Sequence, residues 1–197
     1  FDKLKKSNYF FYPIHVQPES SIDHLGNFYS NQLDIIKSVW KILPDNYILV
    51  VKEHIEFGHR PPYFYREILK CENIKFIYES TNSLDIITNA KAVFSVSGTS
   101  ALEAALSKVN SFTFSKTFFN NLEFSHNIDL NEMKHCSSFQ DLLIRYKGSP
   151  KLKINDYMLF VENHSIAATL SDVYSQPDII NPNNVRSISK GLLQIIN

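Results

Sequence analysis

Short apolar runs alternate with segments of helical periodicity along most of the chain. The runs have the composition of strands buried on both faces and lie at residues 8–16, 47–51, 74–78, 92–96 and 111–114. Residues 29–43, between the first two runs, carry apolar side chains at helical spacing. Strands separated by helices in this way form a parallel, doubly wound sheet. The sequence therefore predicts an α/β, Rossmann-like fold.

The last part of the chain predicts helices only. Residues 138–146 and 155–174 have the apolar spacing of amphipathic helices, and a last short helix is expected from Val185 to Ile195. We therefore expect a Rossmann-like domain over residues 1–150, with the helices of residues 151–197 packed on it.

The composition argues against several classes of function. Twenty basic side chains balance twenty acidic ones among 197 residues, so no overall field attracts nucleic acid. No apolar run approaches the roughly 20 residues of a membrane-spanning helix. Two isolated cysteines, Cys71 and Cys136, fit a reducing cytoplasm, with a single disulfide as the alternative. We expect a cytoplasmic protein, with peripheral association at the inner face of the cytoplasmic membrane as a second location.

Ligands of doubly wound sheets bind at the carboxyl ends of the strands, and three segments lie there. In the first, Ser97-Gly98-Thr99-Ser100 joins a strand to a helix. A helix start offers unpaired N–H groups and hydroxyls, which suit a phosphate. The alternative is an ordinary helix cap, in which Ser100 and Glu103 form a capping box.

The second segment, Lys52-Glu53-His54, follows the second predicted strand. Both Lys52 and His54 can donate hydrogen bonds to a phosphate, and Arg60 on the following loop adds a further cation. The alternative is a solvated strand end.

The third segment holds His15, Gln17 and Glu19, which share one face if the first strand continues to this point. Such a face resembles a binding site. The alternative, of equal weight, is that Pro18 has ended the strand and these are loop residues.

The sequence contains no Asp-x-Asp pair that could hold a metal–diphosphate complex, and no His/Cys spacing that suits zinc. We therefore expect neither a bound metal nor a cofactor.

Taken together, the three segments resemble a family of bacterial capsule-synthesis proteins that includes the Kdo transferases of capsule and lipopolysaccharide assembly. Residues 10–19, FFYPIHVQPE, are similar to the family's LHxQPE segment. Residues 52–54 match its KEHP motif except that Ile55 replaces the proline, and Arg60-Pro61 fits the segment that follows. Residues 97–103, SGTSALE, match its [S/T]GTxxxE motif. The resemblance covers residues 9–115, with order and spacing kept.

This resemblance implies one half of a GT-B fold that holds a nucleotide-activated sugar, with a CMP-linked, Kdo- or sialic-acid-like donor. It implies that His54, Ser97, Thr99 and Ser100 bind the nucleotide phosphate and that Glu103 reaches the ribose or base. It also implies a further N-terminal domain, outside this chain, that carries the acceptor site and usually the catalytic base. Within this chain, Glu19 is the candidate base.

We therefore expect a glycosyltransferase domain that acts in surface-glycan synthesis, with a nucleotide sugar and a glycan or glycolipid acceptor as its partners. One alternative is a nucleotide-sugar epimerase of the same fold, which needs no acceptor. The other is a non-catalytic domain that binds nucleotide or serves as a scaffold.

Overall fold

The computed structural model describes residues 4, 6–54, 60–146, 151–166, 168–170 and 176–196. The chain forms two compact units, Phe1–Ile154 and Asn155–Asn197. The predicted packing of the C-terminal helices on the first domain stays a prediction.

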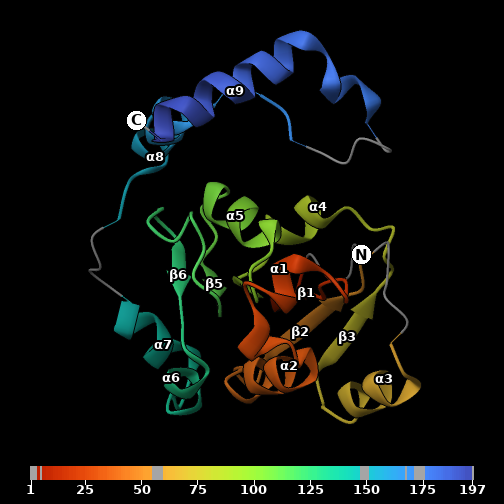
Figure 1. Ribbon diagram of the computed structural model, residues 1–197. Coiled ribbons are helices and arrows are strands. Elements are labelled where there is room, and N and C mark those ends of the chain that lie inside the picture. Colours follow the sequence, from red (N-terminus) through yellow and green to blue (C-terminus); the bar gives the residue numbers. More distant parts are fainter. Residues whose placement is uncertain are drawn as a thin grey trace. The chain divides into compact units, whose positions relative to one another are not determined.

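The first unit is built on a six-stranded sheet in which every neighbouring pair is parallel (Figure 1). Its strands are β1 (Asn8–Pro13), β2 (Tyr47–Lys52), β3 (Ile74–Ile77), β4 (Ala92–Ser95), β5 (Ser111–Thr113) and β6 (Ser125–Asn127). They are arranged in the order β3-β2-β1-β4-β5-β6. The predicted α/β, Rossmann-like fold is confirmed.

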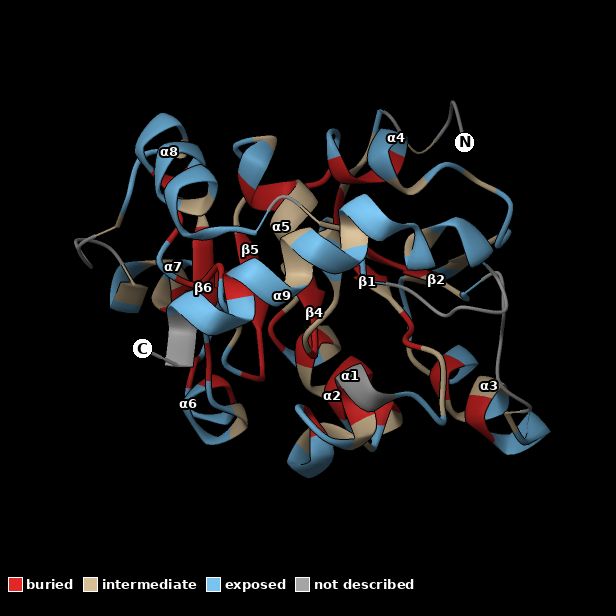
Figure 2. Cartoon of the chain, turned by 45° about the horizontal axis from the view of Figure 1, so that its top comes forward, coloured by how far each residue is buried: buried red, intermediate tan, exposed pale blue. Residues whose placement is uncertain are grey.

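Helices cover both faces of this sheet (Figure 1). They are α1 (Ser20–Asp23), α2 (Gln32–Lys41), α3 (Pro62–Leu69), α4 (Ser83–Ile87), α5 (Thr99–Leu106), α6 (Leu130–Lys134) and α7 (Phe139–Tyr146), with a 3-10 turn at Asn27–Tyr29. Phe10 and Tyr12 of β1 belong to a core shared with α2, α3, α6 and α7. Tyr9 and Phe11 belong to the core on the α4 and α5 side. Successive side chains of a strand point to opposite faces, so β1 contributes side chains to both cores. Figure 2 is coloured by how far the described residues are buried.

In the first unit, two predicted elements differ from the observed ones and one strand was not predicted. The first strand ends at Pro13 rather than near residue 16, so His15, Gln17 and Glu19 are loop residues and the shared strand face is wrong. The helix predicted from residue 29 begins at Gln32, because Tyr29 closes the preceding 3-10 turn. The sixth strand was missed, since its sequence, Ser-His-Asn, lacks the apolar residues by which the other strands were recognised.

The second unit contains α8 (Ile154–His164), a 3-10 turn at Pro177–Ile180 and α9 (Pro182–Ile196). The helix predicted over residues 155–174 is therefore too long, because its helical part ends at His164. Asn184 of α9 holds the segment between the helices, because its side chain exchanges two hydrogen bonds with the backbone of Thr169, at 2.8 and 2.9 Å. No helix in the described ranges is long and apolar enough to span a membrane. Cys71 and Cys136, both in the first unit, are free thiols.

The first prediction concerns the core. Phe112 of β5 has no exposed surface (0%) and stacks on Phe94, with ring centroids 4.9 Å apart. Because Phe112→Ala leaves a cavity, we expect it to lower the free energy of unfolding by about 3–5 kcal/mol. The matched control is Phe28→Ala, since Phe28 is 79% exposed and its loss should change stability by about 0.5 kcal/mol or less. Urea denaturation of both variants measures the difference, and equal midpoints would contradict this description of the core.

Candidate functional site

A cavity of about 460 Å³ lies at the carboxyl ends of β1 to β4. From β1 the chain adds β2 and then β3 on one side, and it then returns to add β4 on the other side of β1. The switch point, at which such folds bind ligands, therefore lies between β1 and β4. The cavity is lined by nine of the predicted site residues: His15, Glu19, Lys52, His54, Ser97, Gly98, Thr99, Ser100 and Glu103. The structure therefore brings the three sequence motifs together, while their binding roles stay predictions.

The start of α5 forms one wall of this cavity and carries no side-chain cap. Its N-cap is Gly98, in an extended conformation (φ −71°, ψ 154°), with no side-chain hydrogen bond to the first turn. The capping box of Ser100 and Glu103 is therefore not formed, because Ser100 already lies inside the helix. The first N–H groups of a helix have no partner within the helix, so this wall offers donors and a positive dipole end to a ligand.

Gly98 also allows the imidazole of His15 to approach the start of α5. A Cβ atom on Gly98 would lie 3.0 Å from His15 Cε1 and 2.9 Å from Ser95 Oγ. Both distances are tighter than ordinary packing, so a larger residue would displace the ring. The Gly98 N–H donates to Ser95 Oγ at 3.0 Å, which fixes the turn between β4 and α5.

His15 is buried, with 8% of its surface exposed. Burial, together with the positive charges of Arg60 and His54, lowers its pKa to about 4. The imidazole is therefore neutral at physiological pH.

Lys52, at the end of β2, supplies a cation to the cavity. Within the described part of the chain, its ammonium group makes no hydrogen bond or ion pair. Burial lowers the pKa of Lys52, and the negative charge of Glu79 partly offsets this effect. Since Lys52 lines the cavity, its ammonium group can donate hydrogen bonds to a ligand there.

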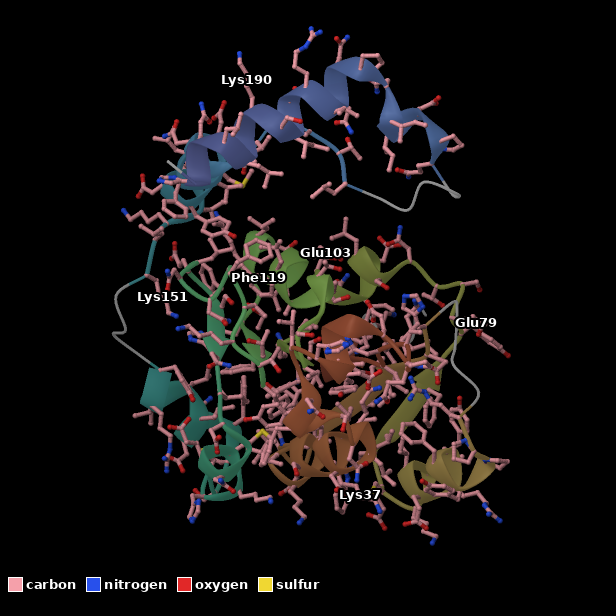
Figure 3. All side chains as sticks on the ribbon, viewed as in Figure 1. Lys37, Glu79, Glu103, Phe119, Lys151 and Lys190 are labelled. Carbon is pink, nitrogen blue, oxygen red and sulfur yellow. The ribbon has the colours of Figure 1, made fainter. Side chains whose placement is uncertain are left out.

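Glu79 and Ser83 also line the cavity, and sequence reasoning missed both. Glu79 follows β3 as Lys52 follows β2, so the rule that selects strand ends could have found it. Figure 3 labels Glu79 in the segment after β3 and Glu103 on α5. Burial raises the pKa of the Glu103 carboxyl group above its usual value. Glu19, in contrast, is exposed.

Arg60 and Gln17, two further predicted site residues, are not among the residues that line the cavity. The Arg60 guanidinium donates to Glu53 Oε2 at 3.1 Å, to Gln17 Oε1 at 3.3 Å and to the backbone oxygen of His15. Gln17 also receives a hydrogen bond from Gln32 at 2.8 Å. These side chains hold the loop after β1 against the loop after β2, which is a positioning role.

Glu53 anchors the segment that carries His54. Its carboxylate accepts hydrogen bonds from Arg60, from the Tyr65 hydroxyl at 2.8 Å and from the His54 backbone N–H at 3.0 Å. His54 itself is exposed at the cavity. Ile55, which replaces the family's proline, falls outside the described residues. Across the ranges that the structure describes, no group of three or more His, Cys, Asp or Glu residues could hold a metal ion.

Neither a family model nor a curated protein matches the chain. Among solved structures, UDP-GlcNAc 2-epimerase from Methanocaldococcus jannaschii aligns with a TM-score of 0.52 at 15% identity, over 80% of this chain and 46% of that one. The structure of the epimerase from the same organism in complex with UDP-GlcNAc and UDP gives 0.51 at 14%, over 81% and 46%. The beta Kdo 2,7 transferase KpsC of Thermosulfurimonas dismutans gives 0.49 at 18%, over 66% and 44%.

This chain thus spans less than half the length of each of these proteins. At such low identity, the likeness to the epimerase structures shows a shared fold. The chain has the Rossmann-like α/β architecture found in proteins of GT-B type.

The second prediction concerns pH. Burial lowers the pKa of both His15 and His126 to about 4. Between pH 6.5 and pH 4 the unfolded chain therefore binds protons that the folded chain does not, so stability is full above pH 6.5 and falls as the pH approaches 4. We expect a loss of roughly 3 kcal/mol for each histidine over this window.

Urea denaturation at several pH values measures this loss, and His126→Phe should remove about half of it. NMR titration of the imidazole resonances gives each pKa directly. A His15 pKa near 6.5 would contradict the enclosure of its ring.

Proposed function

We propose that this domain binds the phosphate of a nucleotide-activated sugar and forms the donor-binding half of a glycosyltransferase that builds bacterial surface glycan. The observation that carries the proposal is the uncapped start of α5 facing the same cavity as Lys52 and His54, at the switch point of the sheet. Helix starts and nearby cations are the usual means of holding a phosphate in such folds.

The chemistry of glycosyl transfer suits these groups. When the bond between the sugar and the phosphate oxygen breaks, negative charge develops on the leaving phosphate. The Lys52 ammonium, His54 and the hydroxyls of Thr99 and Ser100 are placed around one cavity and can stabilise that charge. Ser97 and Gly98 complete the turn that presents these donors.

The carboxylates of the cavity take different parts in the proposal. Glu103 lines the cavity from α5, where its carboxyl group can hydrogen-bond the ribose or base of the nucleotide. Glu19 is an exposed carboxylate on the cavity and the candidate base toward an acceptor hydroxyl of a glycan or glycolipid. The resemblance to the Kdo transferases assigns the acceptor site, and usually the base, to a further domain.

A nucleotide-sugar epimerase is the second candidate. Its specific support is that Glu19 and Glu103 share the cavity with the phosphate donors, because epimerisation requires acid and base groups beside the sugar. Product analysis separates the two functions, since an epimerase converts the nucleotide sugar without an acceptor.

The third prediction tests the phosphate site. His54→Ala should weaken nucleotide binding by about 1–3 kcal/mol, the usual effect of losing a charge-assisted hydrogen bond, with the fold intact. Thr99→Val should act in the same direction. Calorimetric titration with CMP measures both changes.

The matched control is His135→Ala, because His135 is an exposed histidine at the end of α6 and does not line the cavity. Glu103→Gln should weaken CMP binding while leaving the binding of inorganic phosphate unchanged. An unchanged CMP affinity of His54→Ala would remove His54 from the proposed site.

The fourth prediction concerns the nucleotide and the metal. A diphosphate brings more charge into the site, and many enzymes that bind one recruit Mg²⁺ or Mn²⁺ through an acidic pair. The sequence has no Asp-x-Asp pair, and the cavity has the uncapped start of α5 with two nearby basic side chains, Lys52 and His54. We therefore propose a CMP-linked donor, with CMP binding more tightly than UDP or GDP and EDTA leaving its affinity unchanged.

Calorimetric titration of the three nucleotides, each with and without EDTA, measures the order of affinities. Tighter binding of UDP, or loss of binding in EDTA, would refute the CMP assignment while leaving the glycosyltransferase proposal standing.

A further inference from the structure

The hydrogen bonds around His15 determine which ring nitrogen carries its proton. The backbone N–H of Val96 points at His15 Nε2, 3.3 Å away, and an N–H group can only donate. Nε2 must therefore accept, so in the neutral ring the proton lies on Nδ1. Ser95 agrees with this assignment, because its Oγ accepts from the Gly98 N–H and is free to donate its own hydrogen to Nε2 at 2.9 Å.

The protonated nitrogen, Nδ1, is the ring atom that is left to donate to a ligand, and His15 is one of the residues that line the cavity. Within the described part of the chain Nδ1 has no hydrogen-bond partner, and it is not among the unpaired polar atoms that are fully enclosed. Because the rest of the ring is buried and His15 lines the cavity, the exposed edge of the ring is the edge that opens into it. A buried side chain thus presents one unused donor to the candidate site.

The ring also lies beside the start of α5. Cε1, the atom between the two ring nitrogens, is 3.0 Å from where a Cβ on Gly98 would be. Gly98 is the N-cap of α5, so the His15 ring lies next to the first N–H groups of this helix, which are the groups that would hold a phosphate.

We propose that His15 binds the ligand directly, by donating a hydrogen bond from Nδ1–H to an anionic oxygen of the phosphate held at the start of α5. This inference rests on the proposed phosphate site and adds to it a donor from the loop after β1. The imidazole takes part as a neutral group, so it adds a hydrogen bond without adding charge.

A neutral donor matters for the choice of ligand. Lys52 and His54 are the basic side chains among the described residues that line the cavity, apart from the neutral His15, and four glutamates line it as well: Glu19, Glu53, Glu79 and Glu103. A site with few cations and several carboxylates favours a phosphate of low charge over a highly charged diphosphate. A hydrogen bond from His15 strengthens binding of the phosphate without changing this balance.

NMR of the full 197-residue chain tests the assignment without any substitution. Long-range ¹⁵N–¹H spectra of the imidazoles distinguish a protonated nitrogen from an unprotonated one. In the free protein we expect His15 with its proton on Nδ1 at pH 7. On addition of CMP, or of inorganic phosphate as a simpler probe, the Nδ1–H resonance should shift downfield while Nε2 remains an acceptor.

Substitution supplies the energetic test. His15→Gln keeps an acceptor near the position of Nε2 but lacks a donor at the position of Nδ1. We expect its affinity for CMP and for inorganic phosphate to fall about tenfold, the usual effect of losing a hydrogen bond to a charged group. The matched control, His135→Gln, replaces an exposed histidine of α6 and should leave both affinities unchanged.

The outcomes separate this inference from the proposed function. If the native chain binds CMP but His15 carries its proton on Nε2, or if His15→Gln binds CMP as tightly as the native chain, the role of His15 is refuted and the phosphate site stands. If the native chain binds no nucleotide but inorganic phosphate shifts Nδ1–H, the nucleotide assignment fails and His15 remains an anion ligand. If neither probe shifts Nδ1–H, the inference is wrong even where His15→Gln fails to fold.

Discussion

The structure of the first unit depends on β1, which is buried on both faces. Residues 9–12 have no exposed surface, and their side chains alternate between the two cores. β2 and β4 pair with β1 on either side, so the chain builds the sheet outward in two directions from this strand. That topology opens a gap above the carboxyl end of β1, because the connections on its two sides run away from each other. The position of the cavity is thus a consequence of where the central strand lies.

β1 is too apolar to contribute polar side chains to a binding site, so the polar residues of this segment lie in the loop that follows the strand. The backbone N–H of Ile14 still pairs with Lys52 O at 2.9 Å, which aligns the end of β1 with the end of β2. Beyond Ile14, the backbone is held by hydrogen bonds to side chains rather than to a neighbouring strand. The Gln32 side chain exchanges two hydrogen bonds with the His15 backbone, at 2.7 and 3.0 Å. Arg60 and Glu53 then join this loop to the next one. Polar side chains that hydrogen-bond one another hold their backbone segments in place, so His15, Gln17, Glu53 and Arg60 are fixed relative to one another.

The strand–helix alternation and the convergence of the three motifs could be predicted from the sequence because both depend on local patterns. Apolar runs define β1 to β5, and the rule for parallel sheets places their ends together. β6 could not be found in this way, because Ser125 and His126 are buried through contacts with distant residues. His126 stacks on Phe112, for example, with ring centroids 5.1 Å apart.

The division between ligand-facing and positioning residues also required the structure. Gln17 and Arg60 belong to motifs that adjoin the cavity, yet the hydrogen bonds of Gln17 to Gln32 and to Arg60 join segments more than ten residues apart in sequence. No local pattern encodes such pairs. The same applies to Gly98: the motif marks a tight turn, but only the fold shows that the glycine also leaves room for the His15 ring.

The donors and carboxylates that line the cavity suit different parts of one ligand. Donors and the helix start gather on the β4 side, at Ser97 to Ser100, whereas Glu79 and Ser83 lie past the end of β3 and line the same cavity. Carboxylates repel a phosphate but accept hydrogen bonds from hydroxyl groups, so they suit a sugar or ribose rather than an anion. Lys52 lies at the end of β2, which is between β3 and β4 in the sheet. It is therefore between the Glu79 side and the α5 side of the cavity, and it feels the negative charge of Glu79. A ligand with an anionic centre and hydroxyl-rich groups on either side of it meets complementary partners in this arrangement. A free anion would meet donors at the start of α5 and at Lys52 and His54, but it would leave the carboxylates without hydroxyl partners.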